Sequence, residues 1–206
     1  MAETTSIPRE GSRTSRNGWK WAAGAVVAGM VGLAAAGCGG STPTAAAPTS
    51  TAPQVEHVSM TIETGHMIHK PGWPRYTNAF WKAKAGDTVV LTIKSYDDGT
   101  APLSPDSPYN KVLGTVNGTE LVNGQPVSQF ADNAVAHTFT VPGLGLNIVV
   151  PAAPTGGTVT VQATFKVPKA GTYNWQCEAP CGTTASGWGG PMETPGWMQG
   201  TITIAN

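Results

Sequence analysis

The stretch that decides the fold is KAGDTVVLTIKSYDDG, residues 84–99. Val89, Leu91 and Ile93 recur at every second position, which predicts a strand that turns one face toward a core. Gly86 and Asp87 are expected to form the turn into this strand, and residues 97–99 the turn out of it. The stretch therefore favours an all-β protein.

Similar alternation recurs along the chain. Val58, Met60 and Ile62 alternate with polar residues, and further strands are predicted at residues 136–141, 158–167, 171–177 and 199–205. Asn117-Gly118 and Asn123-Gly124 each predict a hairpin turn. No segment shows a helical period over three turns. These segments predict a β-sandwich, with residues 100–135 as a long polar excursion on its surface.

The composition supports this fold class and excludes some functions. Only 12% of the residues are charged, and 26 Gly and 17 Pro favour a turn-rich β protein. After residue 38 there are eight Lys and Arg against ten Asp and Glu, a formal charge of −2 with His neutral. No basic block lies outside the first 20 residues, so no nucleic-acid partner is expected. Hydrolase and phosphate-loop motifs do not occur, so we do not predict an enzyme.

The N-terminal segment has the pattern of an export signal. Four basic residues precede the apolar run from Trp21 to Gly37. The end of this run and the next residue read LAAAGC, residues 33–38. This ending resembles the lipobox of bacterial lipoproteins, which implies that Cys38 is acylated and anchors the protein to the cell membrane. An uncleaved transmembrane helix is the alternative. Both interpretations place the remaining chain outside the cytoplasm.

Three parts of the chain follow from these patterns. Residues 1–38 are the predicted lipoprotein-type signal, and residues 56–206 are the predicted folded domain. Residues 39–55 between them are rich in Ser, Thr, Ala and Pro. Such a segment has little apolar surface to bury, so we expect a disordered tether.

Candidate metal ligands gather toward the C-terminus. The stretch NWQCEAPCGTTASGWGGPM, residues 174–192, holds Cys177, Cys181 and Met192, and His137 lies in a predicted strand upstream. Thiolate, thioether and imidazole together suit copper, and the soft sulfurs favour Cu(I). His66 and His69 form a second group that either supplies an imidazole or lies on a wet surface loop.

The order of these segments resembles the cupredoxin family over about residues 80–206. KAGDTVVLTI is followed by HTFTV at 137–141, KAGTYNWQC at 169–177, a Met-containing loop and GTITI at 200–204. The resemblance implies a Greek-key β-sandwich that carries copper and exchanges electrons with a redox partner. It implies that His137, Cys177 and Met192 are copper ligands.

The two cysteines add a second resemblance. Cys177-x3-Cys181 is similar to the copper A domain of cytochrome oxidase subunit II, which implies two thiolate ligands and a weak ligand in the Glu178 carbonyl. In that pattern a His stands four residues after the second Cys, where this chain has Ala185. The second imidazole of the pattern is therefore missing.

Simpler structural roles remain open for the same residues. Cys177 and Cys181 can pair as a disulfide, because exported proteins retain disulfides. Met198 is a further candidate metal ligand, but Met192 and Met198 can instead serve as core packing. We therefore predict an exported, membrane-tethered copper protein for electron transfer or copper handling, with a metal-free binding or structural module as the alternative.

Overall fold

The computed structural model describes residues 52–206. The predicted export signal, the lipid attachment at Cys38 and most of the predicted tether lie outside the described residues. The fold begins just before the predicted boundary, since Gln54 O accepts a hydrogen bond from Thr88 N and Val55 already pairs with Thr88.

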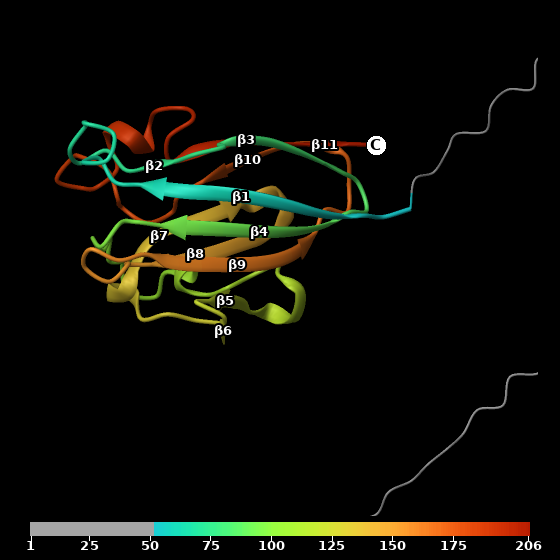
Figure 1. The fold of residues 1–206 in the computed structure, drawn as a ribbon, viewed down its shortest axis with the longest axis horizontal. Helices are drawn as coiled ribbons and strands as arrows, with labels where there is room; N and C mark the ends of the chain where they lie inside the picture. The colour runs from blue at the N-terminus through green and yellow to red at the C-terminus, as the bar shows by residue number, and fades with distance from the viewer. Residues whose placement is uncertain (1–51) are drawn as a thin grey trace, which may run out of the picture. The chain divides into compact units, whose positions relative to one another are not determined.

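Within residues 52–206 the regular structure consists of strands and short 3-10 turns (Figure 1). The strands are β1 (Val55–Glu63), β2 (Arg75–Tyr76), β3 (Phe80–Lys84), β4 (Thr88–Ser95), β5 (Glu120–Val122), β6 (Gln125–Val127), β7 (Val135–Val141), β8 (Leu146–Pro151), β9 (Val159–Lys166), β10 (Gly171–Gln176) and β11 (Gln199–Ala205). The turns are η1 (Pro108–Asn110), η2 (Val116–Gly118), η3 (Asp132–Ala134), η4 (Pro142–Leu144) and η5 (Gly190–Met192). No helix among these residues is long and apolar enough to cross a membrane.

Two sheets form the predicted β-sandwich. One has the order β2-β1-β4-β9-β5-β6 and the other the order β3-β11-β10-β7-β8. Most neighbours in a sheet are not consecutive in sequence, as in Greek-key sandwiches. The prediction of an all-β sandwich is confirmed.

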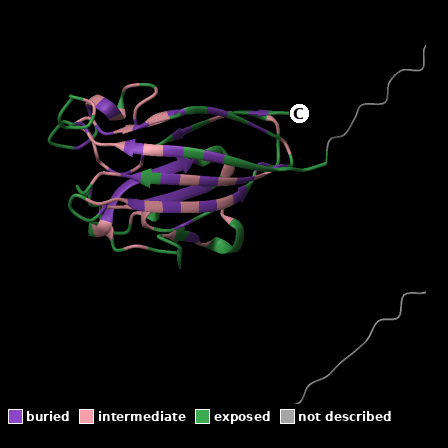
Figure 2. Cartoon of the chain, viewed as in Figure 1, coloured by how far each residue is buried: buried purple, intermediate pink, exposed green. Residues whose placement is uncertain are grey.

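The core lies between the two sheets. Val89, Leu91 and Ile93 of β4 are at most 1% exposed, and Val58, Met60 and Ile62 of β1 are buried beside them. Figure 2 shows buried residues alternating with more exposed ones along β1, β4 and β9. The period of two in the sequence thus identified the inward faces correctly.

Strand β8 was not predicted, because its sequence carries no alternation. Leu146, Asn147, Ile148, Val149 and Val150 are all buried. Its partner β7 is likewise buried at all seven positions. A strand covered on both faces does not alternate between apolar and polar residues, so the periodicity that marks a half-buried strand is lost.

The two Asn-Gly pairs behave differently. Asn123-Gly124 connects β5 to β6, as predicted for a hairpin. Asn117-Gly118 has positive φ at both residues, 67° and 66°, but lies in η2 and joins no pair of strands. The hairpin prediction for Asn117-Gly118 was wrong, because this turn has the expected backbone conformation but no two flanking strands that pair.

Residues 100–135 are more than a surface excursion, and that prediction is corrected. Leu103 and Val112 belong to the core, and β5 pairs with β9. The segment also covers the free edge of β8, where Leu113 and Asn147 exchange two backbone hydrogen bonds. Nearby, Val149 N donates to Glu120 Oε2 at 3.1 Å. Covering an edge strand in this way protects its polar groups from pairing with other chains.

Glu120 makes folding stability depend on pH. Its side chain is 1% exposed and its Oε1 has no partner, and burial raises its pKa from 4.5 to about 8. Between these values the folded protein holds a proton that the unfolded chain releases, so the free energy of unfolding falls as pH rises. We expect Glu120→Gln to be more stable than wild type at pH 8.5 by about 1–3 kcal/mol, and nearly equal at pH 4.

Urea denaturation of the reduced protein at both pH values measures this difference. Glu56→Gln is the matched control, because Glu56 is exposed and should change neither value. Equal stability of wild type and Glu120→Gln at pH 8.5 would contradict the assignment.

Candidate metal centre

The candidate ligands meet at one end of the sandwich, where several strands begin or end. β4 ends at Ser95, β7 begins at Val135, and β10 ends at Gln176, directly before Cys177. The loop that returns to β11 lies at the same end (Figure 1). Strand order therefore brings residues that are far apart in the sequence to the same end of the sandwich.

His137 lies on β7 beside a β-bulge. Val135 pairs with Pro151 and His137 with Val150, so Ala136 is the extra residue. Bulges are common next to functional sites because they redirect a side chain. The imidazole is 1% exposed, and its Nε2 lies 2.9 Å from Asp97 Oδ2. Its Nδ1 is buried and has no hydrogen-bond partner.

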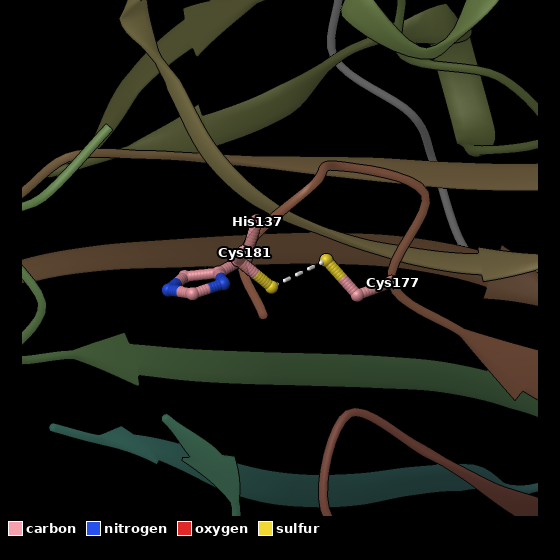
Figure 3. A group of neighbouring side chains, drawn as sticks. All are labelled: His137, Cys177 and Cys181. Carbon is pink, nitrogen blue, oxygen red and sulfur yellow. Dashed lines mark hydrogen bonds between the residues drawn. The ribbon is translucent and has the colours of Figure 1, made fainter. Parts of the chain in front are cut away.

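The two cysteines lie beside this imidazole as free thiols. Their sulfurs are 3.4 Å apart, and Met192 Sδ is 3.3 Å from Cys181 Sγ. One ligand atom each from His137, Cys177 and Cys181 lies within 4.8 Å of the others. Figure 3 shows one ring nitrogen facing the sulfurs and the other pointing away. Since Nε2 is bound to Asp97, the nitrogen that faces the sulfurs is Nδ1.

Thr138 attaches the cysteine loop to β7. Its backbone N–H donates to Cys177 Sγ at 3.4 Å, and its Oγ1 accepts from Glu178 N at 2.7 Å. The Cys177 backbone N–H donates to Met198 O. Cys177 is thus held at its sulfur by β7 and at its backbone by the residue just before β11.

The charges at the site favour a thiolate at Cys177. Burial raises its pKa, but the hydrogen bond from the Cys181 thiol and the nearby His137 imidazole outweigh burial, so the net pKa lies well below the usual range. The same hydrogen bond, together with burial, holds the pKa of Cys181 well above the usual range. Burial lowers the pKa of His137, but Asp97 and the Cys177 thiolate raise it to about 9. The direction of these shifts favours a thiolate at Cys177 over one at Cys181.

The loop after Cys181 folds tightly on itself and carries Met192 back to the sulfurs. Gly182 N donates to Gly187 O at 2.6 Å, and Thr184 Oγ1 accepts from the backbone N–H groups of Trp188 and Gly189. Gly187 has a φ of 76°, a conformation that favours glycine. These bonds give the Met192 thioether a defined position.

A pocket of about 240 Å³ reaches the site from the surface. Its lining includes Asp97, His137, Pro180 and Cys181. Cys181 is partly exposed, whereas Cys177 is only 1% exposed. An ion entering from solvent would therefore meet Cys181 and His137 first.

Of the remaining sequence candidates, neither His66 nor His69 joins this group of ligand atoms. His66 and His69 are exposed in the turn after β1, and Met198 is fully buried in the core. The role of the Glu178 backbone carbonyl as a weak ligand stays a prediction, and the Glu178 carboxylate accepts from Gln176 Nε2 at 2.5 Å. Ala185, where the copper A pattern has a His, is exposed on the loop.

Sequence reasoning missed two residues that contact the candidate ligands. Asp97 was assigned only to a turn, and Thr138 only to a strand. Neither stands at a recognisable spacing from a cysteine. Their roles come from contacts across about 40 positions of the chain, 40 for Asp97 with His137 and 39 for Thr138 with Cys177.

The residues present fit a copper ion. An unpartnered buried nitrogen, two sulfurs and a nearby thioether converge, and soft sulfur with imidazole is a donor set that suits copper. Oxygen ligands, which Ca²⁺ and Mg²⁺ require, are not among these atoms.

Comparisons with known proteins do not assign the chain to a family. No protein-family model and no curated protein matches the chain. Among solved structures, reduced rusticyanin is 19% identical, with 75% of this chain and 81% of that chain covered and a TM-score of 0.36. Rusticyanin from Thiobacillus ferrooxidans is 18% identical, with 73% of this chain and 77% of that chain covered and a TM-score of 0.35. Auracyanin B is 14% identical, with 77% of this chain and 93% of that chain covered and a TM-score of 0.31. At these values the site has to be assessed from its own atoms.

Gly182→Ala should disturb the position of Met192. An added Cβ would overlap Gly189 O and lie 2.9 Å from Met192 Cγ, so the loop must move. We expect a loss of about 1–3 kcal/mol in unfolding free energy, measured by thermal or urea denaturation. Ala185→Ser, in the exposed part of the same loop, should be neutral. A neutral Gly182→Ala variant would show that the loop is looser than described.

Proposed function

We propose that this protein binds one copper ion through His137 Nδ1, Cys177 Sγ and Cys181 Sγ, with Met192 Sδ as a further, weaker ligand, and that it carries electrons or copper outside the cytoplasm. The observation that carries the proposal is the buried His137 Nδ1, which has no hydrogen-bond partner and faces two sulfurs that are not joined in a disulfide (Figure 3). This set completes a site from sulfur ligands where the copper A pattern would use a second imidazole.

The protein's own residues would prepare the site in three ways. The lowered pKa of Cys177 favours its thiolate form, which can act as the first ligand. Any proton on His137 Nδ1 or Cys181 Sγ would have to leave before the metal binds. The pocket beside these two groups gives each proton a path to solvent. β7 holds His137, and the hydrogen bonds of Thr138 hold Cys177 beside it.

The bound copper would supply reversible one-electron chemistry or a transferable Cu(I). A set with more sulfur than nitrogen favours Cu(I), so we expect copper to be held mainly in the reduced state. A redox or copper-exchange partner is expected to approach the face where Cys181 reaches the pocket.

Substitution of the ligands tests the proposal. We expect the reduced wild type to retain one Cu(I) per chain against a chromophoric chelator. Cys177→Ser, Cys181→Ser and His137→Gln should each weaken Cu(I) binding more than about 100-fold. Mutation of residues that only contact a ligand already lowers metal affinity by about 10–100-fold. Met192→Leu should have a smaller effect, because thioether is the weakest of the four ligands.

Matched controls come from the same chain. His69→Gln and Met67→Leu remove an exposed imidazole and an exposed thioether, and both should bind copper as wild type does. No retention of Cu(I) by the reduced wild type would overturn the proposal. An intact mass two hydrogens below the dithiol form, stable to mild reductant, would then favour the Cys177–Cys181 disulfide and the metal-free module.

We further propose that the domain is exported and tethered to the bacterial membrane through acylated Cys38. The apolar run and LAAAGC at residues 33–38 support this. In cell fractionation, wild type should be found with the membrane, and Cys38→Ser should lack the lipid-modified mass and signal cleavage. If Cys38→Ser matches wild type in mass and processing, residues 21–37 act as an uncleaved anchor instead.

A further inference from the structure

The His137–Asp97 contact is the feature that the copper proposal leaves unused. Asp97 follows β4, 40 positions before His137, and its Oδ2 lies 2.9 Å from Nε2. The imidazole is almost fully buried, while the Asp97 side chain is 22% exposed in the wall of the pocket. Asp97 is thus in contact with a candidate ligand without being close enough in sequence to be recognised.

The Asp97 carboxylate is held firmly in place. Its Oδ1 accepts from Gly99 N at 3.0 Å, its backbone N–H donates to Ser95 Oγ at 3.2 Å, and its backbone oxygen accepts from Ala153 N at 2.8 Å. Each carboxylate oxygen therefore has one partner, and the turn has no freedom to reorient the group.

The chemistry of the pair fixes the ring. A carboxylate only accepts hydrogen bonds, so the nitrogen opposite it must carry the hydrogen. With the hydrogen on Nε2, the nitrogen that can lose its proton to a metal is Nδ1, which faces the sulfurs. Ligating histidines commonly donate their other N–H to a carboxylate, which sets the tautomer and orientation of the ring.

We infer that Asp97 is a positioning residue that holds the His137 imidazole with Nδ1 directed at Cys177 and Cys181, so that Nδ1 rather than Nε2 binds the ion. This inference rests on the proposed copper function for its purpose. The orientation of the ring itself is a property of the metal-free protein.

The substitution Asp97→Asn distinguishes hydrogen bonding from mere size. Asparagine has one oxygen, whereas Gly99 N–H and His137 Nε2–H both require an acceptor. If the oxygen faces Gly99, the amide N–H₂ faces Nε2 and favours the wrong tautomer. The variant keeps the shape of Asp97 but cannot satisfy both donors.

Asp98→Asn is the matched control, because it removes one negative charge at the next residue. The hydrogen bonds that the structure gives to the Asp97 backbone do not involve the Asp98 side chain. A purely electrostatic effect of the turn would therefore appear in both variants, and a positioning effect only at Asp97.

The experiment has two readouts. In the reduced, metal-free protein, nitrogen-15 NMR of the His137 ring should show a slowly exchanging Nε2–H in wild type and in Asp98→Asn. That signal should be lost in Asp97→Ala and Asp97→Asn. With Cu(I) as the probe, a chelator competition should show about 10–100-fold weaker binding for both Asp97 variants and unchanged binding for the control.

The two readouts separate the inference from the proposal on which it rests. If wild type binds no Cu(I), the copper function fails, while the ring NMR still tests Asp97. If Asp97→Ala keeps the wild-type Nε2–H signal, or if both Asp97 variants bind Cu(I) within twofold of Asp98→Asn, the positioning role is overturned.

Discussion

The attachment of the cysteine loop to β7 through Thr138 is the constraint on which the site depends. β7 and β10 pair at a single position, Gln176 with Thr140, so the sheet alone does little to fix the loop that follows β10. Thr138 supplies what the sheet lacks, because its backbone N–H meets Cys177 Sγ and its hydroxyl oxygen accepts from Glu178 N. His137 is the preceding residue on the same strand. Imidazole and first sulfur are therefore held by adjacent residues, and their separation cannot change without breaking buried hydrogen bonds, each of which leaves an unsatisfied polar group.

Thr138 also joins the site, through Thr140 and Asn147, to residues 100–135, which cover the edge of β8. Asn147 Nδ2 donates to two backbone oxygens, those of Tyr109 and Lys111, and its Oδ1 accepts from Thr140. Thr140 thus uses its hydrogen on Asn147, so Thr138 must donate to Thr140 at 2.9 Å. This chain of hydrogen bonds runs in one direction from Glu178 N–H to Asn147, which strengthens each bond. These bonds also show what residues 100–135 contribute to the site. Without them the hydroxyls on the outer face of β7 would lie open to solvent, and Asn147 Nδ2 would lose its acceptors, the backbone oxygens of Tyr109 and Lys111.

Much of the fold could be predicted because local physical rules decided it. Val89, Leu91 and Ile93 face the core since a half-buried strand alternates, and Asn123-Gly124 makes a hairpin because its neighbours pair. The failures have equally specific causes. β8 has no period because Asn147 and Val149 are covered by the segment that contains Leu113 and Glu120. Asn117-Gly118 has the backbone of a turn, but no two strands meet there. In each case a distant segment determined the outcome, and no local pattern reports what a distant segment will cover.

The sequence by itself determined the chemistry available to this protein: one strand histidine, two cysteines four positions apart and a methionine beyond a glycine-rich loop, with no histidine at position 185. Residue type alone limits such a set to soft metals or to a disulfide. Only the tertiary structure decided which of these atoms meet. It brought His137, Cys177, Cys181 and Met192 together, and it left His66 and His69 exposed outside that group. It also placed Asp97 against Nε2. The physical reason is that strand order, which is set by burial over the whole sandwich, fixes the distances between groups that lie tens of residues apart.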